Sequence, residues 1–390
     1  MKIVFSMWRH STFPESFPRG PLGGAEVAAW QIARKLSQHH EVEIHCLSEY
    51  KKDQIQQIQA NRTRGNIESG GSVRLVRIGT PMDSKWFKGD IYFNRSLQKA
   101  KDADIIQAVT CIEPALYHPR VFLHLENELH PYLPYPRPKR SIYEQAIPKL
   151  AGVFGVSRYV SKNFTKKVDF DGPVKTILNG ADCSQFTPRA EDRELLMERT
   201  GIPTGARIIL YVGAIHRRKG LHLLLQSFEE VSKEQESYLM VIGGIIYSKT
   251  RPEDLTYLKE QEKRMKRNPK VIFLGPIPRP ELPLYLASSD IFICPSIWND
   301  PCPLVCAEAQ ASGIPVIGFN KGGIPEIIEH NKTGLICRPD KNALIRNMGY
   351  LLGDPRQSRK MGKKARIRAQ MALDWSIIAK KMELCYRKTE

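Results

Sequence analysis

Three consecutive basic residues stand where an apolar segment gives way to a predicted helix. Arg217, Arg218 and Lys219 follow the apolar segment 208–212 and Gly213, in the sequence YVGAIHRRKG. Ligands of doubly wound sheets bind beyond the carboxyl ends of the strands, so we expect these cations to face a cleft. Arginine grips a phosphate with a forked pair of hydrogen bonds, and lysine supplies a point charge. The segment predicts a phosphate site; an exposed basic loop is the alternative.

Two acidic residues further along the chain, Asp300 and Glu308, lie eight positions apart. A helix is predicted to begin near Pro303, so the N–H groups of Leu304 and Val305 would have no partner inside it. The helix dipole favours an anion at that end. Glu308 lies just over one turn beyond Leu304 and can reach hydroxyl groups of the same ligand. The segment therefore predicts a diphosphate seat beside a carboxylate that binds hydroxyls.

A glycine pair opens the first predicted helix, which spans residues 24–38. Gly23 and Gly24 begin the sequence GGAE. Glycine allows backbone N–H groups to approach a ligand closely, and a helix N-terminus stabilises an anion. Taken alone, the same residues also fit a tight turn between a strand and a helix.

Short apolar segments alternate with amphipathic ones along the whole chain. The predicted strands are 2–6, 41–47, 73–78, 104–109, 121–125, 152–157, 175–179, 207–213, 238–243, 270–274, 290–294, 314–319 and 334–337. The predicted helices are 24–38, 191–200, 221–234, 253–266, 303–312 and 341–352. Strands rich in Val, Ile and Leu between helices indicate parallel sheets that are covered on both faces. The chain is thus predicted to be an α/β protein with two doubly wound domains.

The boundary between these domains is predicted where the sequence turns polar, between Gly180 and Gly205. We place the first domain at residues 1–185 and the second at 186–371. A further irregular stretch, HPYLPYPRPKR at 130–140, contains four prolines and is predicted to be a long loop.

The chain of 390 residues carries a formal net charge of +18. Such an excess favours an anionic partner, which could be a nucleotide, a nucleic acid or an acidic membrane. The densest basic run, RQSRKMGKKARIR at 356–368, contains no acid. A solvated helix face is its simplest interpretation, with contact to anionic lipid or an acidic substrate as alternatives. Nucleic acid is disfavoured because no basic stripe is interleaved with stacking aromatic residues.

Membrane insertion and metal binding are both disfavoured by the sequence. No apolar run approaches 18 residues, so we expect no transmembrane helix, and the first residues turn polar too soon for a signal peptide. Several of the eight cysteines lie inside apolar runs, which is typical of reduced cysteines in a cytoplasmic protein. Cys302 and Cys306 have no two further ligands close by in the sequence, so no metal site is expected there.

The order of the motifs is more informative than any one of them. GGAE, VSRYVSKNF, LNGAD, YVG with RRKG, VIGG, VIFLGPI, ASSDIFICPS, the acid pair and GGIPEII follow one another over nearly the whole chain. This series resembles the GT-B glycosyltransferases of family GT4. The resemblance implies two Rossmann-like domains that face a cleft, with the acceptor on the first and the nucleotide-sugar donor on the second. It also implies that a C-terminal helix, 372–390, crosses back onto the first domain.

The resemblance assigns roles to the charged motifs. Arg218 and Lys219 would bind the donor diphosphate and stabilise it as the leaving group. Glu308 would hold the nucleotide ribose, while Leu304 and Val305 would contact the diphosphate through their backbone N–H groups.

The same resemblance completes the set of expected site residues. His124, in FLHLEN, matches the histidine that family members place near the donor sugar; a core or loop histidine is the alternative. Ile277 would lie beside the base, and Gly24 would approach the diphosphate. The other expected donor-binding residues are Gly23, Gly213 and Pro303.

Two positions depart from the family pattern. Ala214 stands where an arginine is usual, and Arg218 could supply the missing guanidinium. Asp300 stands where a glutamate is usual, so its side chain is one methylene shorter and its carboxylate is set back by over about 1 Å, on the scale of a carbon–carbon bond. We expect it to act at the sugar end of the donor.

The expected activity is retaining, metal-independent transfer of a sugar, with UDP as the default nucleotide. Two cations and a helix N-terminus can stabilise the departing diphosphate, and no D-x-D motif between a strand and a loop argues for a divalent ion. The acceptor would be a sugar, a lipid-linked sugar or a small molecule. The rival interpretations are a nucleotide-sugar epimerase or phosphorylase, and a non-catalytic protein of a coat or surface assembly.

Overall fold

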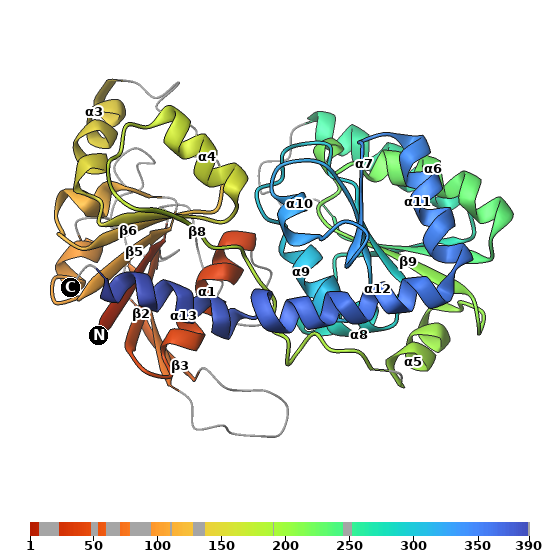
Figure 1. The fold of residues 1–390 in the computed structure, drawn as a ribbon, viewed down its shortest axis with the longest axis horizontal. Coiled ribbons are helices and arrows are strands. Elements are labelled where there is room, and N and C mark those ends of the chain that lie inside the picture. The colour runs from red at the N-terminus through yellow and green to blue at the C-terminus, as the bar shows by residue number, and fades with distance from the viewer. Residues whose placement is uncertain are drawn as a thin grey trace. The chain divides into compact units, whose positions relative to one another are not determined.

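The chain forms two compact units (Figure 1). The computed structural model describes residues 1–7, 23–47, 54–59, 71–78, 95–109, 111–127, 137–189, 191–244 and 252–388. The N-terminal unit comprises Met1–Asn179 together with Trp375–Glu390, and the C-terminal unit comprises Gly180–Asp374. The sequence analysis placed the corresponding divisions after residue 185 and before residue 372.

An eight-stranded sheet forms the centre of the N-terminal unit, in the order β3-β4-β2-β1-β5-β6-β7-β8. Its strands are β1 (Lys2–Met7), β2 (Glu41–Leu47), β3 (Gln54–Gln59), β4 (Ser72–Ile78), β5 (Ile105–Val109), β6 (Val121–Leu125), β7 (Gly152–Gly155) and β8 (Val174–Thr176). All neighbours are parallel except β3 and β4, which are antiparallel. Strands β1, β5 and β6 are fully or nearly fully buried, as expected for a sheet covered on both faces.

Helices from both ends of the chain cover this sheet. They are α1 (Gly24–Leu36), α3 (Arg137–Ala146), α4 (Arg158–Lys167) and α13 (Trp375–Arg387), with 3₁₀ turns η1 (Glu113–Leu116) and η2 (Ile147–Lys149). α13 packs against α1 (Figure 1), so the last helix of the chain belongs to the first unit. α4 begins at a serine cap, because Ser157 Oγ accepts the N–H of Val160 at 3.2 Å.

A six-stranded parallel sheet forms the centre of the C-terminal unit, in the order β11-β10-β9-β12-β13-β14. Its strands are β9 (Arg207–Val212), β10 (Ser237–Ile242), β11 (Val271–Gly275), β12 (Ile291–Cys294), β13 (Val316–Phe319) and β14 (Gly334–Cys337). The chain builds outward from β9 to β11 and then restarts on the other side with β12. This reversal of strand order between β9 and β12 is the point where ligands bind in doubly wound sheets.

The helices of the C-terminal unit alternate with its strands. They are α5 (Glu191–Thr200), α6 (Leu221–Glu234), α7 (Pro252–Arg267), α8 (Leu282–Ala287), α9 (Leu304–Ala311), α10 (Ile324–Ile327), α11 (Lys341–Gly353) and α12 (Pro355–Arg368), with η3 (Arg217–Lys219), η4 (Arg279–Glu281) and the π-helical turn η5 (Ala369–Leu373). The core includes Leu224, Phe228, Ile293 and Phe319, each with no exposed surface.

The structure differs from the sequence prediction at several elements, among them β3, α3, α4 and α8, none of which was predicted. β3 was not predicted, and its Ile55 and Ile58 are three residues apart, whereas side chains on one face of a strand repeat every two. The loop predicted at 130–140 is wrong from Arg137 onward, where α3 begins; residues 130–136 of that loop lie outside the described chain. Pro138 is the second residue of this helix, a position where a missing N–H costs nothing.

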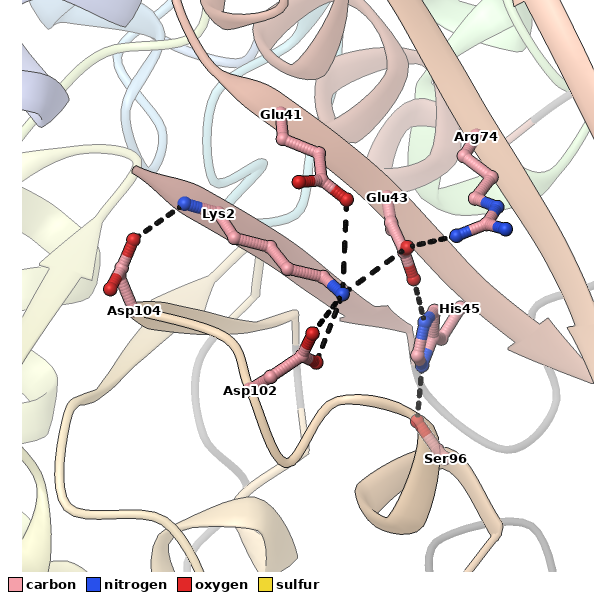
Figure 2. Close-up of polar contacts among 8 residues, drawn as sticks. All are labelled: Lys2, Glu41, Glu43, His45, Arg74, Ser96, Asp102 and Asp104. Atoms are coloured by element: carbon pink, nitrogen blue, oxygen red, sulfur yellow. Dashed lines mark hydrogen bonds and ion pairs between the residues drawn. The ribbon is translucent and has the colours of Figure 1, made fainter.

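A cluster of charged residues links β1, β2 and β4 and holds these strands in register (Figure 2). Glu43 of β2 receives hydrogen bonds from Arg74 of β4 at 2.9 Å and from His45 at 2.8 Å, and lies 3.6 Å from Lys2 Nζ of β1. Burial alone would raise the pKa of Glu43, but these partners outweigh it and hold that pKa at about 2. His45 in turn contacts Ser96 Oγ at 2.9 Å, so the cluster ties three neighbouring strands together.

Candidate active site

The predicted phosphate-binding residues lie at the reversal point of the second sheet. β9 pairs with β10 on one side and with β12 on the other. The loop after β9 leads into η3, which contains Arg218 and Lys219, and the loop after β12 leads into α9. The cations and the acid pair therefore meet at the carboxyl edge of two adjacent strands.

A glycine allows these two loops to touch. Gly220, which ends η3, has a φ of 74°, and a Cβ placed there would lie 1.7 Å from the carbonyl oxygen of Pro295. The carbonyl of Arg218 accepts the N–H of Ile297 at 2.9 Å. Any side chain at position 220 would clash with backbone and adopt a left-handed conformation. The spacing of the two loops is thus set by backbone contacts.

Lys219 and Asp300 form an ion pair at the centre of this site. Lys219 Nζ donates to Asp300 Oδ2 at 2.5 Å, with 26% of the lysine side chain and 7% of the aspartate side chain exposed. Arg218 lies over the ring of Trp298, with its Cζ 4.6 Å from the ring centroid. The aspartate carboxylate is therefore directed at the lysine, while the lysine remains partly open to solvent.

The loop after β13 holds the backbone of Asp300. Gly323 donates its N–H to the carbonyl of Asp300 at 2.8 Å. Gly322 has a φ of 53°, and a Cβ there would lie 2.2 Å from the same carbonyl oxygen. The glycine pair of GGIPEII, quoted above only as a motif, thus has a physical role, because it permits close backbone contact with the acid.

Glu308 is buried in α9 and paired with an arginine that the sequence analysis did not single out. Its side chain has no exposed surface, and its Oε1 accepts a hydrogen bond from the guanidinium of Arg279, in η4. Arg279 is 31% exposed and its Cζ lies 5.9 Å from the ring centroid of Phe186. The second carboxylate oxygen, Oε2, has no hydrogen-bond partner within the described chain. A buried acceptor without a partner is costly, so a ligand hydroxyl would satisfy it.

The remaining expected donor-site residues lie on the same unit. Leu304 and Val305 are the first two residues of α9, and Pro303 precedes them with extended backbone. Gly213 follows β9 and packs against the turn after β10, while Ile277 lies two residues before Arg279. A search for basic residues just after Ile277 would have found Arg279, but nothing in the sequence shows that it reaches Glu308.

The cysteines beneath the site are packing residues. Cys294, Cys302 and Cys306 are buried, and no cysteine forms a disulfide. Burial raises the pKa of the Cys306 thiol well above its usual range, so this group stays neutral.

His124 lies in the N-terminal unit, at the end of β6, in a chain of hydrogen bonds. The hydroxyl of Tyr386, in α13, donates to Gln107 Oε1, and Gln107 Nε2 donates to His124 Nδ1 at 2.9 Å. Because Nδ1 accepts, the proton of the neutral ring lies on Nε2. Burial lowers the pKa of His124 to about 4, so the ring is neutral at pH 7 and acts only as an N–H donor from that atom.

Glu126, two residues beyond, is a candidate site residue that the sequence analysis missed. Its Oε2 accepts a hydrogen bond from Asn179 at 2.8 Å, and its Oε1 lies 3.6 Å from His124 Nε2. Burial raises the pKa of Glu126 to about 8, so the carboxyl is protonated at neutral pH and this contact is not an ion pair. Neither His124 Nε2 nor Glu126 Oε1 has a hydrogen-bond partner among the residues described.

The glycine pair at the start of α1 belongs to the same edge of this unit. Gly24 is the first residue of α1, Gly23 caps it, and the carbonyl of Gly23 accepts the N–H of Val27 at 3.0 Å. Glu26, in the first turn, raises the pKa of Glu126 through its charge, which places the helix start near the end of β6. The structure thus brings Gly23, Gly24, His124 and Glu126 to one edge of the first sheet.

An open hollow of about 560 Å³ lies elsewhere, at the amino ends of β1 and β2. It is lined by Met1, Lys2, His39, His40 and Glu41, among others. Since parallel sheets bind ligands at the opposite edge, we do not place the active site there. In the described part of the chain, no three His, Cys, Asp or Glu side chains cluster as a metal site would require, and no helix is long and apolar enough to cross a membrane.

Two family models match the chain in sequence order. Residues 22–185 match the family described as Glycosyltransferase Family 4, and residues 192–368 match Glycosyl transferases group 1. With the two Rossmann-like units and their charged site, these matches define a glycosyltransferase of the GT-B class. The chain belongs to the GT4 group of these enzymes.

Curated relatives match this chain at modest sequence identity. The spore coat protein SA of Bacillus subtilis is 27% identical over 275 residues, which is 68% of this chain and 72% of the relative. A D-inositol 3-phosphate glycosyltransferase of Corynebacterium kroppenstedtii is 33% identical over 211 residues, 52% of this chain and 46% of the relative.

Solved structures show the same fold over the full chain length. A sucrose-phosphate synthase of Thermosynechococcus elongatus superposes with a TM-score of 0.78 at 20% identity, covering 100% of this chain and 99% of the other. The HepE protein of Anabaena, in complex with UDP-glucose, superposes with a TM-score of 0.75 at 18% identity, covering 100% of both chains. These likenesses confirm the predicted fold class.

Proposed function

We propose that this glycosyltransferase transfers a sugar from a nucleoside diphosphate sugar, with UDP as the nucleotide, and retains the anomeric configuration. The observation that carries the proposal is the pairing of Lys219 with Asp300 beside Arg218, at the carboxyl ends of β9 and β12. The loop after β12 leads into α9, whose first turn and buried Glu308 complete this group of residues. The diphosphate, the ribose hydroxyls and the sugar of such a donor would each have a partner of suitable chemistry there.

Charge on the leaving group explains why two cations are needed. As the bond between the sugar and the diphosphate breaks, negative charge grows on the diphosphate. Arg218 and Lys219 stabilise that charge, together with the N–H groups of Leu304 and Val305. Because Lys219 is partly exposed, it can exchange Asp300 for a phosphate oxygen without being drawn from a buried site. These groups support transfer without a divalent metal ion.

The nucleotide remains a proposal because the relatives differ in their donors. The structures of HepE contain UDP and UDP-glucose, which supports UDP. A relative in Mycolicibacterium smegmatis, 29% identical over 216 residues, is a GDP-mannose-dependent mannosyltransferase. The acceptor, which we assign to the N-terminal unit, is a sugar, a lipid-linked sugar or a small hydroxyl compound, and the cytoplasmic location stays a prediction.

A thermal-shift screen of UDP-, GDP- and ADP-sugars tests the donor. A ligand present at 100 times its Kd adds roughly 2.7 kcal/mol of stability, which is easily resolved. We expect one UDP-sugar to stabilise the protein and to release UDP when an acceptor panel is added. Stabilisation by GDP-sugars alone would reassign the nucleotide.

A coat or surface role without turnover is the second candidate, because one relative carries the name spore coat protein SA. Binding of a nucleotide sugar with no transfer across a broad acceptor panel would favour it. Conversion of the donor sugar without any acceptor would instead indicate an epimerase.

A further inference from the structure

The basic run at 356–368 forms an ordered cationic face. It folds as α12, a helix of 14 residues in the C-terminal unit (Figure 1). Its exposed cations are Arg356, Arg359, Lys360, Lys363 and Lys364. At about 100° per residue these five side chains fall within an arc of roughly 140°. We call this surface the α12 face.

The rest of α12 is used by the fold. Met361, Gly362 and Ala365 are buried on the opposite side. Arg366 donates to the carbonyls of Phe186 and Ala311, and Arg368 pairs with Glu329. The helix is thus anchored, and two of its seven cations have structural partners.

Among the residues that the structure describes, the five cations of the α12 face have no such partners. Within the described ranges, none of them forms an ion pair or a hydrogen bond with an acidic side chain. The acid that starts the helix, Asp354, accepts the backbone N–H groups of Arg356 and Gln357 at 3.1 and 3.0 Å. Five like charges side by side repel one another, so an external anionic surface would stabilise them.

Two exposed apolar side chains continue this face. Ile367 is 55% exposed and Met371, in η5, is 73% exposed. An apolar side chain beside a row of cations is the pattern of a surface that contacts lipid headgroups and the outer acyl region. Within the exposed stretch from Arg356 to Met371 there is no aromatic residue to stack on a nucleic-acid base.

We propose that the α12 face binds the surface of an anionic lipid bilayer. The cations attract the acidic headgroups, and Ile367 and Met371 insert among them. This contact does not depend on the donor or acceptor of the enzyme, because no residue of the α12 face belongs to the active site.

Another helix of the same unit supplies a matched control. α7 also carries four exposed cations, Lys259, Lys263, Lys266 and Arg267. These four side chains also share one arc of the helix, but Glu260 and Glu262 border that arc on its two sides, whereas the α12 run contains no acid. Replacing these four cations by glutamine lowers the net charge by the same amount as replacing four cations of the α12 face.

The test is cosedimentation of the full chain with phosphatidylcholine vesicles, with and without phosphatidylglycerol. One variant carries Arg359→Gln, Lys360→Gln, Lys363→Gln and Lys364→Gln, and the control carries the four glutamines in α7. Each cation near an anionic surface is worth roughly fivefold in partitioning, so the α12 variant should lose roughly 10²- to 10³-fold. The α7 control should stay close to wild type, and thermal unfolding checks that both variants fold.

Salt and the apolar pair sharpen the result. Binding should weaken as salt rises, because the Debye length falls from about 10 Å at 0.1 M to about 3 Å at 1 M. Ile367→Ser with Met371→Ser should cause a smaller loss that persists at high salt. Equal losses in the α12 and α7 variants, or equal wild-type binding to neutral vesicles, would overturn the proposal. Tighter, α12-dependent binding to an oligonucleotide would replace the bilayer with a nucleic acid.

Discussion

The two units place opposite kinds of groups at the carboxyl edges of their sheets. In the C-terminal unit the edge carries charges in pairs, Lys219 with Asp300 and Arg279 with Glu308. In the N-terminal unit the edge carries His124 and Glu126, which are buried. Burial lowers the pKa of His124 and raises the pKa of Glu126, so both side chains are neutral at pH 7. The first arrangement suits a charged ligand group, and the second suits hydroxyl groups.

The difference has a simple electrostatic origin. Partly exposed cations such as Lys219 lose little hydration, so they keep their charge for a phosphate. A buried histidine or glutamate without a counter-ion sheds its charge instead, because the neutral form costs less to bury. The two edges thus offer different chemistry although both sheets are doubly wound.

Loss of a cation should produce the largest effect, if the C-terminal edge stabilises the leaving group. We expect Lys219→Ala and Arg218→Ala each to lower kcat by roughly 10²- to 10³-fold, the effect of losing one transition-state donor. Arg217, which the sequence analysis grouped with these cations, is exposed and its charge acts on His222 and Tyr257, so Arg217→Ala is the matched control and should stay near wild type. Steady-state rates decide the matter; near wild-type turnover in both variants would place the cationic site elsewhere.

The two acids of that edge should separate in a binding experiment. Glu308→Gln should weaken UDP binding by roughly tenfold to a hundredfold, because a hydrogen bond to a charged group is worth about 1.5–3 kcal/mol. Asp300→Asn frees Lys219 from its partner, so UDP affinity should hold or rise while turnover falls. Calorimetry with UDP measures both variants, and equal weakening by the two substitutions would contradict this division.

Replacing Glu126 by glutamine tests the carboxyl edge of the N-terminal unit through the pH dependence of the protein's stability. Its pKa of about 8 in the folded chain exceeds the ordinary value of 4.5, so its stabilising contribution is complete below pH 4.5 and is lost as pH rises toward 8. His124, with a pKa lowered to about 4, acts in the opposite sense only below its ordinary value of 6.5. Between pH 6.5 and 8, Glu126 is therefore the group of this pair that titrates.

We expect Glu126→Gln to make the free energy of unfolding less dependent on pH. The variant should gain on the order of a few kcal/mol of stability above pH 8, since one pKa unit corresponds to about 1.4 kcal/mol. Glutamine can still accept the hydrogen bond from Asn179. Thermal unfolding at pH 6 and pH 8.5 gives the comparison. An unchanged slope would show that Glu126 is ionised in the folded chain, and the contrast between the units would fail.

Chelation should have the smallest effect of all. If Arg218 and Lys219 replace a metal ion, transfer should survive excess EDTA without measurable loss. A loss that Mn²⁺ restores would show that the cations of the C-terminal edge are insufficient by themselves.

Local pattern was enough to predict most of the fold. Segments such as 208–212 and 291–294 are continuous apolar runs, and helices such as 221–234 repeat with helical period, so each shows its structure within a few residues. β3 was not predicted because its two isoleucines lie on opposite faces, with Ile55 58% exposed and Ile58 8% exposed. Its antiparallel pairing with β4 cannot be read from the local sequence.

The sequence by itself determined the order of the motifs, and with it the family, the two doubly wound domains and the residues that meet at the reversal of the second sheet. Only the tertiary structure decided the partners of those residues. Arg279 is 29 positions from Glu308, and Asn179 is 53 from Glu126, so no local spacing reveals either contact. Charge state is equally a tertiary property, because burial and the nearest counter-ion set a pKa, and both depend on which distant segments pack together.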